Sequence, residues 1–182
     1  MRRILFLLTA LLVMRLAGYG EAMSSCSVAA LPTGISNILT SQFPGWRIAT
    51  LENLESYDRD LWIKSKPGKC PGITAGHFFN AHMKSFAVLL VPEDAHGKGY
   101  KVIAFKPIDG KGNVKPVAVE ESGTENASDV VIYRLPPGVF EDPDRTRRVR
   151  VQLDALQVEK MEVSTKLYFW QAGRFERLIT SN

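Results

Sequence analysis

The chain has 182 residues, of which 45% are hydrophobic and 23% charged, as in an ordinary globular protein. Its formal net charge of +4 at pH 7 is too small to predict a nucleic-acid partner. Only two cysteines are present, Cys26 and Cys70. These numbers exclude a disulfide-rich scaffold and a low-complexity chain.

The N-terminal segment, residues 1–22, has the order of a secretory signal peptide. Two arginines precede an apolar run of eleven residues, Ile4 to Met14, and small residues follow around Ala22. Because a membrane-spanning helix needs about 20 apolar residues, the run is too short for an anchor. We expect cleavage after Ala22, with Ala29 or Ala30 as alternatives, and export to the periplasm or exterior of a bacterial cell without a remaining membrane span.

Residues 23–182 are expected to form a single globular domain. They contain 20 Lys and Arg against 18 Asp and Glu, because the removed segment holds three arginines and one glutamate. This leaves a net charge of +2 over 160 residues, enough chain for a hydrophobic core. We therefore expect no nucleic-acid partner.

The cysteines predict one disulfide, between Cys26 and Cys70, because an even pair in an exported chain is normally oxidised. The bond would join the start of the mature chain to a loop over residues 66–72 that is rich in Pro and Gly. Two alternatives stay open: free thiols, or loss or lipidation of Cys26, which follows Met23-Ser24-Ser25.

The N-terminal third predicts two helices around a short strand. Residues 32–43 have apolar side chains at helical spacing and end before Pro44-Gly45. Residues 46–51 alternate as a strand does. A short second helix is expected over residues 52–63.

From residue 73 the chain has the pattern of β-strands. The expected strands cover residues 85–91, 100–106, 114–119, 129–135, 148–153, 165–170 and 175–180. Residues 156–163 fit a strand or a helix, and the polar segment 120–128 is expected to be exposed. The predicted fold class is α+β, with the N-terminal helix and the short second helix packed on one antiparallel, meander-type sheet.

The segment from Cys70 to Leu90 combines a turn with an apolar strand. Gly76 and Phe78 lie in the turn, and Phe86 to Leu90 form the strand. These residues resemble a degenerate FG-GAP or VCBS-type repeat over about residues 70–91. Such segments occur in small secreted bacterial proteins of unknown function.

The resemblance implies a calcium loop, but the residues at the ligand positions depart from it. Calcium requires oxygen ligands, mostly carboxylates, and those positions hold His77, Phe79, Ala81 and Ser85. We therefore expect no metal here and no cofactor, and we expect Phe78 or Phe79 to hold the loop by packing on the strand.

Three histidines, His77, His82 and His96, lie within twenty residues. Their spacing matches no standard zinc pattern, so polar loop positions are the first interpretation. The alternative is a hydrolytic site built from His77, His82 and a carboxylate.

Two groups of residues could form a binding surface. Lys166, Tyr168 and Trp170 share one strand face; core packing is the default, but an exposed face would be the best candidate. Arg148 and Arg150 point outward from a strand that follows three acidic residues, so protection of a sheet edge is favoured over contact with an anionic partner.

No nucleophile motif or metalloprotease motif is present. We therefore expect an exported, non-enzymatic domain that binds a protein or a cell-envelope component. The alternative is a small cell-envelope hydrolase that uses the histidines.

Overall fold

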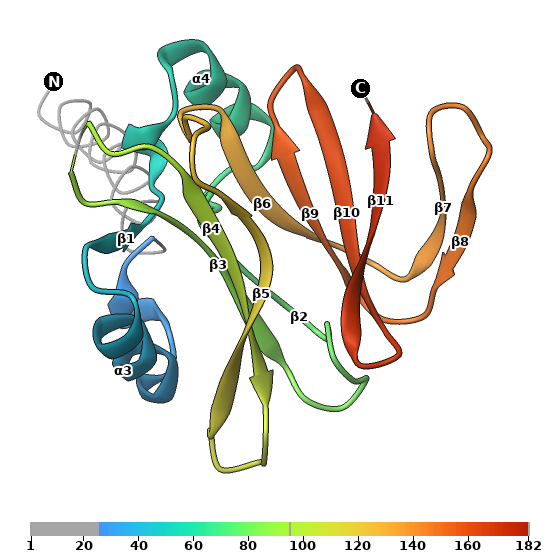
Figure 1. Cartoon of the computed structure of the whole chain (residues 1–182), viewed down its shortest axis with the longest axis horizontal. Helices are drawn as coiled ribbons and strands as arrows, with labels where there is room; N and C mark the ends of the chain where they lie inside the picture. The colour runs from blue at the N-terminus through green and yellow to red at the C-terminus, as the bar shows by residue number, and fades with distance from the viewer. Residues whose placement is uncertain (1–25, 95, 182) are drawn as a thin grey trace, which may run out of the picture.

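The computed structural model describes residues 26–94 and 96–181 (Figure 1). The predicted signal peptide, residues 1–22, lies outside the described residues. Among the helices that are described, none has the length and apolarity needed to cross a membrane.

The described part of the chain is mostly β. Its helical elements are η1 (Val28–Ala30), α3 (Thr33–Gln42), η2 (Leu51–Asn53) and α4 (Ser56–Ser65). Its strands are β1 (Trp46–Ile48), β2 (Ile73–Gly76), β3 (Ser85–Pro92), β4 (Tyr100–Pro107), β5 (Val114–Ser122), β6 (Val130–Leu135), β7 (Gly138–Glu141), β8 (Arg148–Val151), β9 (Ala155–Lys160), β10 (Ser164–Gln171) and β11 (Arg174–Ser181). Helices and antiparallel strands are confirmed as the two components of the fold.

The two helices differ in how well the sequence predicts them. The first ends where expected, because Gly45 turns the chain with a φ of 77°. The second begins later than expected. The Thr50 backbone N–H donates to Asn53 Oδ1 at 2.9 Å and closes a separate 3₁₀ turn, so α4 starts only at Ser56.

The single predicted sheet is divided into three in the structure. A five-stranded sheet has the order β1-β3-β4-β5, with β2 also paired to β3; a four-stranded sheet has the order β11-β10-β9-β6; and β7 pairs with β8. Every pair is antiparallel. The ambiguous residues 156–163 form the end of β9 and a turn. The strand β7 is an addition to the expected strands, and it directly follows Pro136-Pro137.

The two large sheets pack face to face, with cover on both outer faces (Figure 1). Ala87, Leu89 and Val102 of the five-stranded sheet meet Ile132 and Leu156 of the four-stranded sheet in the main core. The other face of the five-stranded sheet packs on α3. The other face of the four-stranded sheet packs on α4 and on the β7–β8 hairpin. Cover on both sides explains why β3 is apolar on both faces.

The loop that resembles a calcium site is held by packing, as expected. Phe78 is 0% exposed and Phe79 is 7% exposed, and both belong to the main core. The buried Ser85 hydroxyl donates to the Gly76 carbonyl and accepts from the Phe78 N–H. Side chains of the chain itself thus fill and fasten this turn.

An irregularity in β5 turns a charged side chain inward. Val102 pairs with Glu120 and Ile103 pairs with Ala118, so Val119 is an extra residue in the ladder. The extra residue shifts the alternation, and the Glu120 side chain faces the second sheet. The prediction that residues 120–128 are exposed is therefore wrong at Glu120, and it is also wrong at Ala127, which is 7% exposed and belongs to the main core.

Candidate functional site

The face of Lys166, Tyr168 and Trp170 on β10 is turned into the molecule. Tyr168 is 5% exposed and lies in the main core, and Trp170 packs edge-on against Phe79 with ring centroids 4.8 Å apart. The interpretation of this face as an exposed binding surface is wrong, because the five-stranded sheet covers it.

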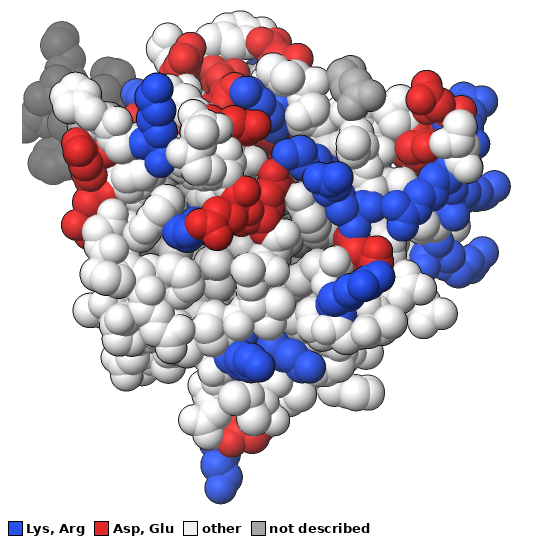
Figure 2. Space-filling model, viewed as in Figure 1, with Lys and Arg blue, Asp and Glu red and all other residues white. Residues whose placement is uncertain are grey.

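Arg148 and Arg150 point outward from β8, while Phe140 and Val149 pack against the four-stranded sheet. Arg148 Nε lies 3.2 Å from Glu141 Oε1. Figure 2 shows the basic side chains on this side of the molecule directly beside acidic ones. The hairpin therefore carries mixed charge, with little surplus to select an anionic partner.

The histidines do not combine into one site in the described residues. His77 Nδ1 is 3.5 Å from Asp154 Oδ2, whereas His82 and His96 are exposed in loops. The described residues contain no group of three His, Cys, Asp or Glu side chains that could hold a metal ion. The hydrolase hypothesis needs His82 beside a carboxylate as well, and the described ion pairs include none for it.

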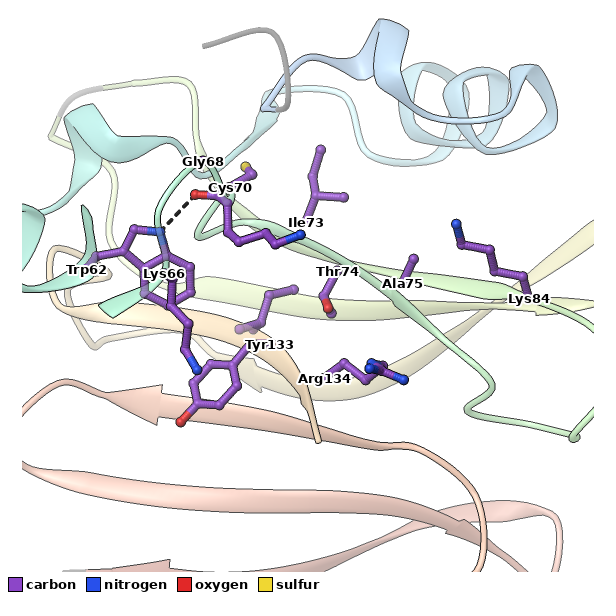
Figure 3. Close-up of a pocket in the computed structure, with 12 residues that line it drawn as sticks. Trp62, Lys66, Gly68, Cys70, Ile73, Thr74, Ala75, Lys84, Tyr133 and Arg134 are labelled. Atoms are coloured by element: carbon purple, nitrogen blue, oxygen red, sulfur yellow. Dashed lines mark hydrogen bonds between the residues drawn. The ribbon is translucent and has the colours of Figure 1, made fainter. Parts of the chain in front are cut away.

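The predicted disulfide between Cys26 and Cys70 is confirmed, with Cα atoms 5.1 Å apart. Cys70 is buried and lines a groove of about 520 Å³ that lies where the two large sheets adjoin, between β2 and β6 (Figure 3). The bond therefore fastens the start of the described chain to the rim of this groove.

The lining of the groove is strongly basic. Lys66, Lys69, Lys84 and Arg134 all line it. Figure 3 shows Lys66 near Tyr133 at the α4 end, and Arg134 and Lys84 farther along β2. The four basic residues thus come from a helix end, two loops and a strand, and they are spread along the groove.

The α4 end of the groove is held in place by several contacts. The buried Trp62 donates its indole N–H to the Lys69 carbonyl at 2.9 Å, and Gly68 turns the loop between them with a φ of 70°. The Lys66 ammonium lies 4.3 Å from the centre of the Tyr133 ring, at the range of a cation–π contact. The loop that carries two of the lysines is therefore anchored at both ends, by Trp62 and by the disulfide.

The floor of the groove is the junction of β2 and β6. The Ile132 N–H donates to the Pro71 carbonyl at 2.9 Å, and no other backbone hydrogen bond joins the two strands in the described structure. Farther along, Asp154 accepts from the His77 N–H at 2.7 Å and lies 3.2 Å from Arg134 Nη1.

Most of the positive charge in the groove is not neutralised. Arg134 has Asp154 as its partner, but no carboxylate of the described residues lies within 4.0 Å of Lys66, Lys69 or Lys84. Lys69 and Lys84 are exposed and Lys66 is half-buried. The groove can therefore attract and hold negative charge.

A second polar cluster closes one end of the main core. Glu120 accepts from the hydroxyls of Tyr100 at 2.7 Å and Tyr168 at 2.8 Å, and its carboxylate lies 2.5 Å from Lys166 Nζ. Burial by itself raises the pKa of Glu120, but the hydrogen bonds from these three groups bring the pKa below its usual value. Burial together with the Glu120 charge raises the pKa of both tyrosines. The cluster is satisfied internally.

A group of acidic residues includes Asp58 on α4 and Asp129, which immediately precedes β6. Burial, followed by the charges of Asp129 and Glu162, raises the pKa of Asp58. Burial also raises the pKa of Asp129, against the opposing effect of Lys160. Asp129 Oδ1 is buried without a hydrogen-bond partner in the described structure.

The groove could not be found from the sequence. Its cations stand at positions 66, 69, 84 and 134, in a chain whose overall charge is modest. The only indication was the loop over residues 66–72, which we expected to hold the disulfide. No family model matches the chain, and no curated protein and no solved structure matches it either.

Proposed function

We propose that the protein is an exported, non-enzymatic domain that binds an anionic component of the cell envelope in the groove between β2 and β6. The main observation that supports this proposal is that four basic side chains line the groove and only one of them, Arg134, has a carboxylate partner. Export is supported by the N-terminal sequence pattern and by the disulfide, which is typical of oxidising compartments.

The contrast with the other charged regions supports this assignment. In the Glu120 cluster the only lysine is paired, and on the β7–β8 hairpin an acidic residue pairs with Arg148. The groove places three lysines without an ion pair beside Arg134, and an anionic ligand there would replace solvent as the partner of these lysines.

The test compares two triple variants of equal net charge. Lys66→Gln/Lys69→Gln/Lys84→Gln removes the unpaired lysines of the groove. Lys98→Gln/Lys111→Gln/Lys115→Gln removes three exposed lysines that do not line the groove. Binding of poly-L-glutamate and of inorganic polyphosphate is measured by calorimetry at several salt concentrations.

The groove variant should weaken binding of at least one of these polyanions by about tenfold or more, which is about 1.4 kcal/mol. The control variant should remain close to the parent protein. Equal weakening in both variants would show attraction by net charge alone. If the parent protein binds neither polyanion, the proposed function is rejected.

A further inference from the structure

We propose that the ligand of the groove is an acidic polypeptide segment in extended conformation, which hydrogen-bonds to the free edge of β2. This inference rests on the proposed function and names the class of ligand for the same site. Charge alone does not choose between an acidic peptide and a phosphate polymer, so the argument depends on the backbone of β2 and β6.

Two backbone hydrogen bonds show which residues of β2 direct their N–H and C=O groups toward β3 and which direct them away from it. The Leu89 N–H donates to the Gly72 carbonyl, so Gly72 faces β3. Because successive residues of a strand face opposite neighbours, Ile73 and Ala75 direct their N–H and C=O groups away from β3. The bond from Ile132 to the Pro71 carbonyl agrees with this alternation, since Pro71 faces β6.

The same reasoning applies to β6. Ile132 uses its N–H toward β2, so Arg134, two residues farther, also directs its backbone groups toward β2. No protein partner is found among the described residues for the backbone N–H groups of Ile73, Ala75 and Arg134 on this side. The floor thus offers a row of alternating donors and acceptors.

Such a row complements a peptide backbone. An unpaired strand edge binds an extended peptide through main-chain hydrogen bonds, while pockets beside the edge select side chains. A phosphate polymer supplies acceptors but no donors for the free carbonyl groups. The lysines along the groove would meet acidic side chains of the added peptide.

The experiment uses a blocked peptide of about seven residues that alternates glutamate and threonine, roughly 23 Å when extended. The comparison peptide has the same sequence with N-methyl groups on alternate residues, so its charge is kept and the N–H donors on one edge of the extended peptide are removed. Inorganic polyphosphate serves as the third probe, and the protein is the disulfide-bonded chain.

The parent peptide should bind, and N-methylation should weaken binding by about tenfold or more, because main-chain bonds carry much of the affinity in this mode. Amide exchange at Ile73 and Ala75 should slow when the parent peptide is bound. Ala75→Pro removes one donor from the free edge without removing a β2–β3 bond, so it should weaken peptide binding and leave polyphosphate binding unchanged.

Equal binding of the parent and N-methylated peptides, or unchanged exchange at both amides, would overturn this inference. Tight binding of polyphosphate without binding of the peptide would also overturn it while leaving the proposed function intact. Failure of all three probes would reject the proposed function together with it. The N-methylated peptide keeps the test decisive even if Ala75→Pro does not fold.

Discussion

The core between the two sheets and the groove between β2 and β6 differ in whether their charged side chains have partners. In the core, Glu120 enters the packed region but meets Lys166 and two tyrosine hydroxyls, so its charge and hydrogen bonds are satisfied. In the groove, Lys66, Lys69 and Lys84 have no carboxylate partner among the described residues.

This difference separates stability from binding. A satisfied polar network in a core holds the fold together, and removal of one member leaves the others buried without partners. Solvated charges on a surface add little to stability, so they can be arranged for a ligand. The comparison can be tested by changing each region separately.

The largest loss of stability is expected from the core. Phe78→Ala should lower the free energy of unfolding by about 3–5 kcal/mol, because a fully buried aromatic side chain is removed. Urea unfolding with and without millimolar calcium measures the effect. A calcium-dependent rise in stability together with a neutral Phe78→Ala would instead support a metal-filled loop, as in the family that the segment resembles.

The disulfide at the groove should also contribute strongly to stability. Cys26→Ser/Cys70→Ser should lower the free energy of unfolding by about 3–4 kcal/mol, because the bond closes a long loop in the unfolded chain. Thermal melting with and without reductant provides a second measurement. Unchanged melting after verified reduction would refute this contribution.

Glu120→Gln should lower the free energy of unfolding by about 1–3 kcal/mol, because Lys166 loses its charged partner inside the structure. The control is Glu121→Gln. Glu121 pairs with Lys101 but its side chain is 60% exposed, so the change should stay within about 0.5 kcal/mol. Similar losses in both variants would contradict the distinction between satisfied and solvated charges.

The buried carboxyl groups should also make the free energy of unfolding depend on pH. The pKa of Glu120 is lowered by folding, so its contribution is present above its usual value near 4.5 and is lost as the pH falls through the lowered pKa. The raised pKa values of Asp58 and Asp129 act in the opposite direction, since their protonation favours the folded state at low pH.

Unfolding measured between about pH 3 and pH 7 should therefore show a flatter acid loss for Glu120→Gln and a steeper one for Asp58→Asn. Equal slopes in the two variants and the parent protein would show that these carboxyl groups do not control acid stability.

The smallest effect on stability is expected in the groove. Lys66→Gln/Lys69→Gln/Lys84→Gln should change the free energy of unfolding by less than about 0.5 kcal/mol per residue, because the two exposed lysines make no ion pair in the described structure and Lys66 contacts only one ring face. A large loss measured by urea unfolding would mean that the groove lysines support the fold and would weaken their assignment to a ligand.

The sequence by itself determined those elements whose structure depends mainly on residues close together in the chain. The first helix, most strands, the disulfide and the packed turn at Phe78 follow from periodicity, from Gly and Pro, from the cysteine pair and from the missing calcium ligands. In each case the deciding residues lie in one short segment or are the only residues of their kind.

The tertiary structure alone decided which strands share a sheet, which way Glu120 points and which basic side chains line one groove. A one-residue bulge in β5 reverses the alternation at Glu120, and the second sheet buries the face of Tyr168. The groove joins positions 66, 69, 84 and 134 through the contact of Ile132 with Pro71. These outcomes depend on contacts between distant segments, which no local pattern records.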